Sequence, residues 1–179
     1  MDNQFISVKE IKENRGYLGK NIGVYKWWCK KARLECILEK LGKSFSEVEN
    51  FLERKNDLYC FYVGQTKNKK GFNKRIKGQH LRSTKNSTLR RSLFALLGNE
   101  EAINDFLNVC FVSVEKLSVG EIDEKEKEQI NAFLRLLNLD DLEDKFESVQ
   151  NFGEIRKQII KTLKEKRSKK VKKGDKGKT

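Results

Sequence analysis

The most strongly apolar short run in the chain lies at residues 58–63 and predicts a buried strand. The run reads LYCFYV and ends at Gly64. A continuous apolar run of this length, stopped by a turn residue, is typical of a strand that is buried on both faces. Two further runs, at 22–28 and 109–114, are rich in β-branched and aromatic residues and predict two more strands.

Between these runs the apolar positions recur every three to four residues, which predicts helices. A helix over 30–41 is closed by Gly42, and Ser46 with Glu49 forms a capping box for a short helix over 48–52. Further helices are predicted over 71–80, from Ser87-Thr88 to Gly98, over 100–107, from Asp123 to Leu137 and from about 153. Residues 1–20 give no clear prediction.

These elements predict one α+β domain with a small sheet, because the helical segments separate the strands. The domain spans 1–155 and carries a helical insertion at about 30–54. A terminal helix and a basic tail occupy 156–179. The low-complexity tail is expected to be disordered.

The charge is distributed unevenly along the chain. The net charge is +13, of which the segment 156–179 contributes +10. No Asp or Glu occurs from Leu58 to Asn99, whereas 121–147 is acidic. A concentrated basic surface favours a polyanionic partner, most simply nucleic acid. The residues predicted to bind it are Lys67, Lys70, Lys74, Lys77, Arg82, Arg90 and Arg91, the last two on the polar side of their helix.

The cysteines indicate a reduced, cytoplasmic protein. Cys29, Cys36, Cys60 and Cys110 show no CxxC spacing, and with one His in the chain a zinc site is not expected. No apolar run approaches the ~20 residues of a membrane span, and the N-terminus has no signal-peptide pattern. We therefore expect no membrane association.

Two strands carry a Tyr beside a Gly. Gly23-Val24-Tyr25 lies in the first predicted strand and Tyr62-Val63-Gly64 in the second. The two phenols would lie close together if these strands pair. Arg75 follows on a helix that faces back towards the strand end, and the 123–138 helix offers a carboxylate.

These residues resemble the GIY-YIG endonuclease superfamily. The resemblance covers about 22–140 and consists of GVY at 23–25, YVG at 62–64, Arg75, His80, Glu126 and Asn138. It implies a three-stranded antiparallel sheet flanked by helices and metal-dependent hydrolysis of a phosphodiester.

The chain departs from the family pattern in four places. The helices at 30–54 lengthen the gap between the tripeptides. His80 comes five residues after Arg75, where the family more often has four. Gln129 replaces the usual Leu, and Glu128 is a second choice for the metal ligand beside Glu126.

The resemblance implies a role for each matched residue. Tyr25 would act as the base, directly or through a water, with Tyr62 as its partner at the phosphate. We expect Arg75, several lysines and a bound metal to favour the Tyr25 phenolate. Arg75 would hold a non-bridging oxygen, and Glu126 would hold Mg²⁺ or Mn²⁺.

Each residue also has a structural explanation. Tyr25 and Tyr62 are common core residues, and His80 is either a phosphate contact or a surface residue. Asp123-x-x-Glu126 forms a plausible capping box. Asn138 could end the helix that precedes it.

The first functional hypothesis is a Mg²⁺-dependent DNA endonuclease. The alternative is a non-catalytic nucleic-acid-binding protein that keeps the fold. A third is an RNA-binding accessory protein that binds mainly through its tail, which deletion of 165–179 would test. Target specificity would come from 30–54, from 65–91 or from a homodimer.

Overall fold

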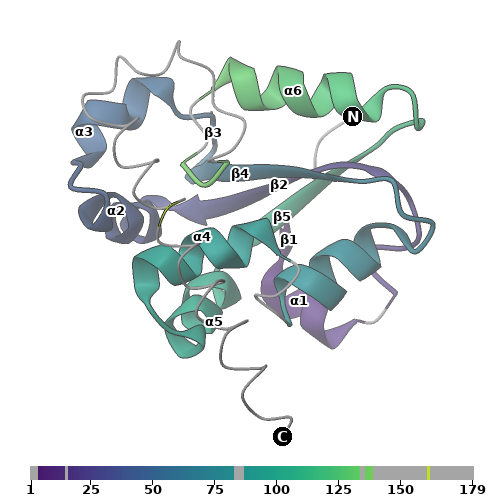
Figure 1. Cartoon of the computed structure of the whole chain (residues 1–179), viewed down its shortest axis with the longest axis horizontal. Coiled ribbons are helices and arrows are strands. Elements are labelled where there is room, and N and C mark those ends of the chain that lie inside the picture. The colour runs from purple at the N-terminus through teal and green to yellow at the C-terminus, as the bar shows by residue number, and fades with distance from the viewer. Residues whose placement is uncertain (1–3, 15, 83–86, 134–135, 139–160, 162–179) are drawn as a thin grey trace, which may run out of the picture.

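The computed structural model describes residues 4–14, 16–82, 87–133, 136–138 and 161 (Figure 1). The strands are β1 (Ile6–Ser7), β2 (Gly23–Lys30), β3 (Arg54–Lys55), β4 (Leu58–Thr66) and β5 (Phe111–Lys116). The helices are α1 (Val8–Glu13), α2 (Lys31–Lys40), α3 (Phe45–Val48), η1 (Glu49–Phe51), η2 (Asn73–His80), α4 (Thr88–Leu97), α5 (Glu100–Asn108) and α6 (Ile122–Ala132).

The five strands form one sheet in the order β1-β5-β2-β4-β3, and every neighbouring pair is antiparallel. The predicted α+β class is confirmed, but the prediction of three strands is wrong. The two additional strands, β1 and β3, contain two residues each and lie at the edges. Such short strands carry too few residues to show an alternating pattern.

Helices cover both faces of the sheet. In Figure 1, α6 lies on one side, whereas α1, α4 and α5 lie on the other. Ile122 and Ile130 of α6 pack with Val24 and Trp28 in the smaller of two core clusters. Trp27 points to the opposite face and lies in the larger cluster. Both tryptophans are fully buried, so neither is available to stack on a base.

A β-bulge interrupts the pairing of β2 with β4. Trp27 pairs with Tyr62, but Trp28 pairs with Cys60, so Phe61 is the extra residue. Phe61 and Tyr62 consequently both belong to the larger core cluster, although successive strand residues ordinarily face opposite sides. Tyr62 lies on the face of the sheet that carries Tyr25 because the pairs Tyr25–Gly64 and Trp27–Tyr62 are regular, and the bulge adds Phe61 to that face.

Several helix boundaries differ from the prediction. The short helix α3 begins four residues after Leu41, and its capping box is formed by Ser44 and Glu47 instead of Ser46 and Glu49. Helix α6 ends at Ala132 instead of continuing to Leu137. The backbone N–H of Leu137 instead donates to the carbonyl of Phe61 in β4 (3.1 Å). Apart from Lys161, the predicted terminal helix and tail lie outside the described residues.

The four cysteines are free thiols, three of them buried and Cys36 exposed. The three buried thiols pack as small hydrophobic residues. Among the residues that the structure describes, no helix has the length and apolar character needed to cross a membrane.

Gly23 begins the central strand β2 in a conformation that only glycine adopts readily. Its φ is +143°, and a Cβ added there would lie 2.0 Å from the carbonyl oxygen of Glu115 in β5. We expect Gly23→Ala to destabilise the protein by more than about 2 kcal/mol, because backbone cannot move aside without breaking the β2–β5 pairing. Thermal unfolding followed by circular dichroism would measure this loss.

Gly120→Ala is the matched control for this variant. A Cβ at Gly120 meets no atom within 4 Å, so its melting temperature is expected to stay close to that of the wild type. Equal melting temperatures for the two variants would contradict the close approach at Gly23.

Candidate active site

The hydroxyl of Tyr25 is the point at which the predicted site residues meet. Arg75 donates from Nε to this oxygen (3.0 Å), and Nε2 of His80 lies 2.6 Å from it. The rings of Tyr25 and Tyr62 lie 6.5 Å apart between centroids. The structure thus brings together Tyr25, Tyr62, Arg75 and His80, which come from β2, β4 and η2.

The local structure of η2 explains how Arg75 and His80 reach the same oxygen although they are five residues apart. Residues Asn73–His80 form a π-helix, in which each N–H bonds the carbonyl five residues earlier. The bond from Leu81 N to Ile76 O (3.0 Å) continues this pattern. One turn of this helix holds more residues than a turn of an α-helix. Arg75 and His80 can therefore be five residues apart, instead of four, and still both point to Tyr25.

Gly64 leaves the space that the Tyr25 ring occupies. The two residues are paired across β2 and β4, and a Cβ at Gly64 would lie 2.4 Å from the Tyr25 hydroxyl oxygen. Tyr62 pairs with Trp27, which is two residues after Tyr25 and on the same face of β2. Tyr62 therefore lies diagonally across from Tyr25 on that face. The glycine of the second tripeptide is thus required by the tyrosine of the first.

Tyr25 is fully buried, and this controls its ionisation. Burial, together with the charge of Glu126, raises the pKa of Tyr25 to about 12, against the opposing charge and hydrogen bond of Arg75. Arg75 thus favours the phenolate, as expected of a neighbouring cation, but without a metal its effect does not outweigh the loss of hydration. The hydroxyl is a neutral phenol that needs a proton acceptor.

His80 provides that acceptor. The side chain is fully buried, with Nδ1 2.6 Å from the hydroxyl oxygen of Ser87 and Nε2 facing Tyr25. In the tautomer with its proton on Nδ1, the imidazole accepts at Nε2 from the Tyr25 hydroxyl and donates to Ser87, and this is the tautomer that proton transfer from Tyr25 requires. His80 is therefore neither a surface residue nor an exposed phosphate contact.

Burial lowers the pKa of His80 well below 6.5, and the charges of Arg75 and Arg90 act in the same direction. The unfolded chain binds a proton at this residue below about pH 6.5, whereas the native state stays neutral. The free energy of unfolding is therefore expected to decrease as the pH falls through this range, by up to about 1.4 kcal/mol per pH unit. Urea unfolding at several pH values would measure the slope.

His80→Gln is the control for this pH dependence, since His80 is the single histidine of the chain. Between about pH 5 and 7 the stability of this variant should be nearly independent of pH. A slope as steep as that of the wild type would assign the dependence to another group.

Arg75 joins the tyrosines to an open, polar pocket of about 190 Å³. Its Nη1 donates to Gln79 (2.6 Å), which fixes the guanidinium plane. Burial lowers the pKa of Arg75, but the neighbouring Tyr25, Tyr62 and Glu126 raise it overall, so the group is a permanent cation. The pocket is lined by Gln65, Thr66, Lys67, Asn68, Lys74, Arg75 and Gln79. Lysine, arginine and amide donors in this arrangement suit a phosphate group.

The two candidate metal ligands have different surroundings. Glu126 is half-buried and lies on α6 between Ile122 and Ile130, at the four-residue spacing of the face that packs on the sheet. Its charge acts on both Tyr25 and Arg75. Glu128 is exposed and pairs with Lys125 (3.0 Å). The geometry therefore favours Glu126.

The capping-box explanation of Glu126 is wrong. Helix α6 begins at Ile122, with Glu121 as its N-cap residue. The carboxylate of Asp123 instead accepts hydrogen bonds from Lys67 (2.5 Å) and Gln65 (3.0 Å). Glu126 is thus not needed to begin the helix.

The donor set fits a hard divalent cation held mainly by water and substrate. Among the described residues, no group of three or more His, Cys, Asp or Glu side chains is placed to hold a metal ion. Mg²⁺ is commonly bound through one or two carboxylates together with substrate phosphates. A single half-buried Glu126, whose charge acts on the pocket residue Arg75, is compatible with that mode.

Asn138 supports the site through the backbone of β4. Its Oδ1 accepts from Val63 N (2.7 Å), and its Nδ2 donates to Val63 O (2.6 Å). The side-chain amide thus pairs with the backbone of β4 past the end of the short strand β3. It fixes Val63, the residue between Tyr62 and Gly64. Its interpretation as the end of the preceding helix is wrong, and we assign it a positioning role.

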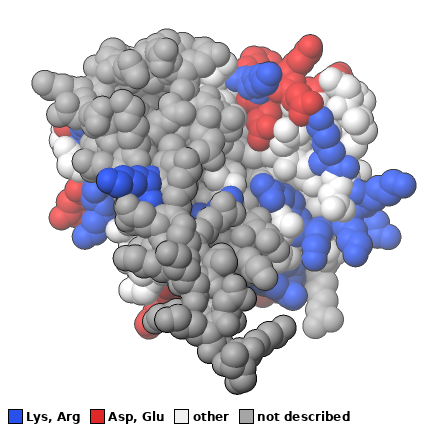
Figure 2. Space-filling model, in the orientation of Figure 1, with Lys and Arg blue, Asp and Glu red and all other residues white. Residues whose placement is uncertain are grey.

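The predicted nucleic-acid-binding residues divide into two groups. The side chains of Lys67, Lys70, Lys74 and Arg82 are exposed. Lys77 is half-buried and donates to the carbonyls of Ile11 and Lys12, and Arg91 is half-buried and donates to Thr88. Figure 2 shows Lys and Arg side chains at both ends of the visible surface, with the larger group at its right-hand end.

Arg90 does not lie on a polar surface as predicted. It is 1% exposed, and its guanidinium donates to the carbonyl of His80 (3.2 Å) and to the side chains of Asn104 and Glu100. The helical period alone does not show that α5 covers this side of α4. Arg90 therefore binds no phosphate and instead connects α4 and α5 to the end of η2.

Two polar residues of the site were not predicted. Gln79 fixes Arg75, and Ser87, expected solely as a helix cap, also contacts His80. The four-residue spacing of Arg75 and Gln79 on one helix is the signal that indicates the first contact. The second depends on the loop between η2 and α4 and has no local signal.

Comparison with known families agrees with this geometry. The family model described as the GIY-YIG catalytic domain matches residues 23–169, which is most of the chain. The search of curated proteins and the search of solved structures each gave no match. The match begins at the first tripeptide and includes every residue that meets at the Tyr25 hydroxyl, and the chain belongs to the GIY-YIG nuclease family.

Proposed function

We propose that this chain is a Mg²⁺-dependent DNA endonuclease that hydrolyses phosphodiester bonds at the Tyr25 site. The observation that carries the proposal is the convergence of Arg75 and His80 on the Tyr25 hydroxyl, beside the polar pocket that Arg75 lines. A tyrosine that only packs in the core needs neither a half-buried cation nor a buried imidazole as its partner.

Substrate binding begins with the phosphate in the polar pocket. Lys74 is exposed there, and Arg75 is the fixed cation at the pocket wall. The guanidinium holds a non-bridging oxygen and stabilises the negative charge that grows as water attacks phosphorus. Tyr62 lies beside Tyr25 and orients the same phosphate.

The attacking water gives its proton to the Tyr25 oxygen while the Tyr25 proton moves to Nε2 of His80. This route avoids a free phenolate, which the buried position of Tyr25 disfavours. The new P–O bond forms as the bond to the leaving sugar oxygen breaks, and that oxygen takes a proton from solvent.

Mg²⁺ or Mn²⁺ bound by Glu126 would supply stabilisation of the leaving oxygen. Glu126 is suited to this role because its charge acts on the site from α6. Exposed lysines at the same end of the molecule would hold neighbouring phosphates without regard to sequence.

The test is cleavage of supercoiled plasmid by the full chain and by Tyr25→Phe. We expect nicked or linear product with Mg²⁺ or Mn²⁺, none with a chelator, and at least about 100-fold less product from Tyr25→Phe. Binding to labelled DNA in chelator should be similar for both proteins. Tight binding by the wild type without cleavage in either metal would favour the non-catalytic binding protein.

A further inference from the structure

A second basic groove adjoins the pocket at Arg75. It encloses about 510 Å³, within the range of about 300–1,000 Å³ that is usual for ligand sites. Three chain segments form it, namely 20–22, 67–69 and 116–119. The backbone N–H of Leu117 donates to Ile22 O (3.2 Å), which holds two of these segments together.

Four lysines line this groove, and one of them, Lys67, forms an ion pair. Lys67 is 2.5 Å from the carboxylate of Asp123 and is thereby partly neutralised. Within the described part of the chain, the side chains of Lys20, Lys69 and Lys116 are exposed and form no ion pair within 4.0 Å. The groove therefore presents three cations that still require an anionic partner.

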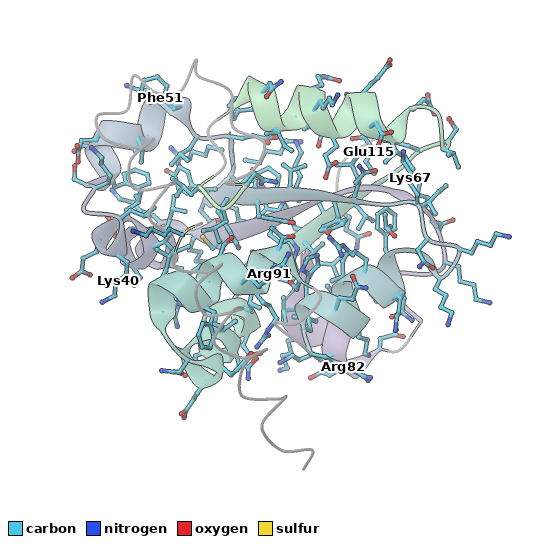
Figure 3. All side chains as sticks on the ribbon, viewed as in Figure 1. Lys40, Phe51, Lys67, Arg82, Arg91 and Glu115 are labelled. Atoms are coloured by element: carbon cyan, nitrogen blue, oxygen red, sulfur yellow. The ribbon has the colours of Figure 1, made fainter. Side chains whose placement is uncertain are left out.

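The groove and the pocket at Arg75 are contiguous. Lys67 lines both of them. In Figure 3, Lys67 lies at the end of the molecule opposite Lys40 and Phe51. A strand whose phosphate occupies the Arg75 pocket thus has its next phosphates at Lys20, Lys69 and Lys116.

The remaining lining of the groove is apolar and argues against a paired strand. Ile22 and Leu117 are half-buried, and Val119 is 59% exposed. A duplex presents sugars and phosphates outward and keeps its base faces stacked, whereas unpaired nucleotides expose base faces for apolar contact. The lysines can contact the phosphates of an unpaired strand, and the apolar side chains between them can contact its bases or sugars.

We infer that this groove binds a single-stranded segment of the DNA whose phosphodiester lies at Tyr25. The three unpaired lysines hold successive phosphates, and Ile22, Leu117 and Val119 contact the bases or sugars. This inference rests on the proposed function for the choice of DNA as ligand. It adds a preference for substrates that carry an unpaired strand next to a duplex.

The experiment compares binding of a blunt duplex with the same duplex carrying a tail of roughly ten nucleotides, of either polarity, a length within the usual range of single-strand sites. Fluorescence anisotropy in chelator measures binding without cleavage. We expect the wild type to bind one tailed substrate more tightly than the blunt duplex. The triple variant Lys20→Ala/Lys69→Ala/Lys116→Ala should lose at least about tenfold on that substrate and reduce its salt slope by about 2.

Two further variants separate the groove from general charge and from apolar contact. Lys9→Ala/Lys40→Ala/Lys55→Ala removes the same charge from exposed positions outside the groove and should keep the preference for the tail. Val119→Ser, at an exposed position, should weaken binding of the tailed substrate severalfold without changing the salt slope.

Equal affinity of the wild type for tailed and blunt DNA would overturn the inference, as would equal losses on both substrates in the groove variant. An equal loss in the control triple variant would also overturn it. Preference for the tail without cleavage in Mg²⁺ or Mn²⁺ would reject the proposed endonuclease activity and retain the groove as a binding site.

Discussion

Arg75→Ala is expected to reduce DNA cleavage by at least about 100-fold while leaving DNA binding within a few-fold of the wild type. Removing one fixed donor to a developing oxyanion costs about 10²–10³ in rate in well-studied hydrolases. Arg75 also donates to the Tyr25 oxygen, so the variant leaves the phenol without its cationic partner. Single-turnover cleavage with saturating enzyme would measure the chemical step.

Arg75→Lys makes this prediction sharper, because it keeps the charge and removes the planar fork of donors. A lysine ammonium cannot contact Tyr25, Gln79 and a phosphate with the same geometry, so the loss should remain large. Lys74→Ala, in the same pocket, is the matched control and should lower affinity with little change in the single-turnover rate. Near-wild-type cleavage by Arg75→Lys would mean that charge alone suffices.

Glu126→Gln should abolish metal-dependent cleavage, whereas Glu128→Gln should cleave like the wild type. The two carboxylates are two residues apart on α6, but only Glu126 acts electrostatically on Tyr25 and Arg75. Glutamine preserves size and removes the charge that a hard cation requires. A titration of cleavage rate against Mg²⁺ would show whether the variant loses apparent metal affinity as well as rate.

The reverse result would move the metal ligand to Glu128, which is exposed and paired with Lys125. Equal loss in both variants would indicate that the acidic face of α6 acts as a whole. Circular dichroism spectra of the two variants should match, since neither carboxylate caps the helix.

The sequence predicts the site better than it predicts the surroundings of the site. Tyr25 and Tyr62 were expected to meet if their strands pair, and they do, because long apolar strands leave few alternative partners. The edge strands β1 and β3 were missed, since two residues cannot show a period. Arg90 was misplaced because local periodicity carries no information about which helix covers a given face.

The bulge in β4 has no signal in the sequence. It shifts the alternation only beyond Tyr62, so the neighbouring phenols follow from the regular pairs Tyr25–Gly64 and Trp27–Tyr62. The raised pKa of Tyr25 has no sequence signal either. The sequence shows nearby cations but does not show that the hydroxyl is fully buried.

The spacing of Arg75 and His80 shows that a sequence search for such sites should not fix the number of residues between the Arg and the His. In a regular α-helix each residue turns by about 100°, so residues five apart differ in direction by roughly 140°. The π-helix over Asn73–His80 removes this difference, and the inserted residue leaves both contacts with Tyr25 in place. A sequence pattern with a fixed gap of four would miss this chain. The geometry requires that both side chains keep their direction toward Tyr25, so an insertion in this turn should be tolerated where a π turn restores that direction.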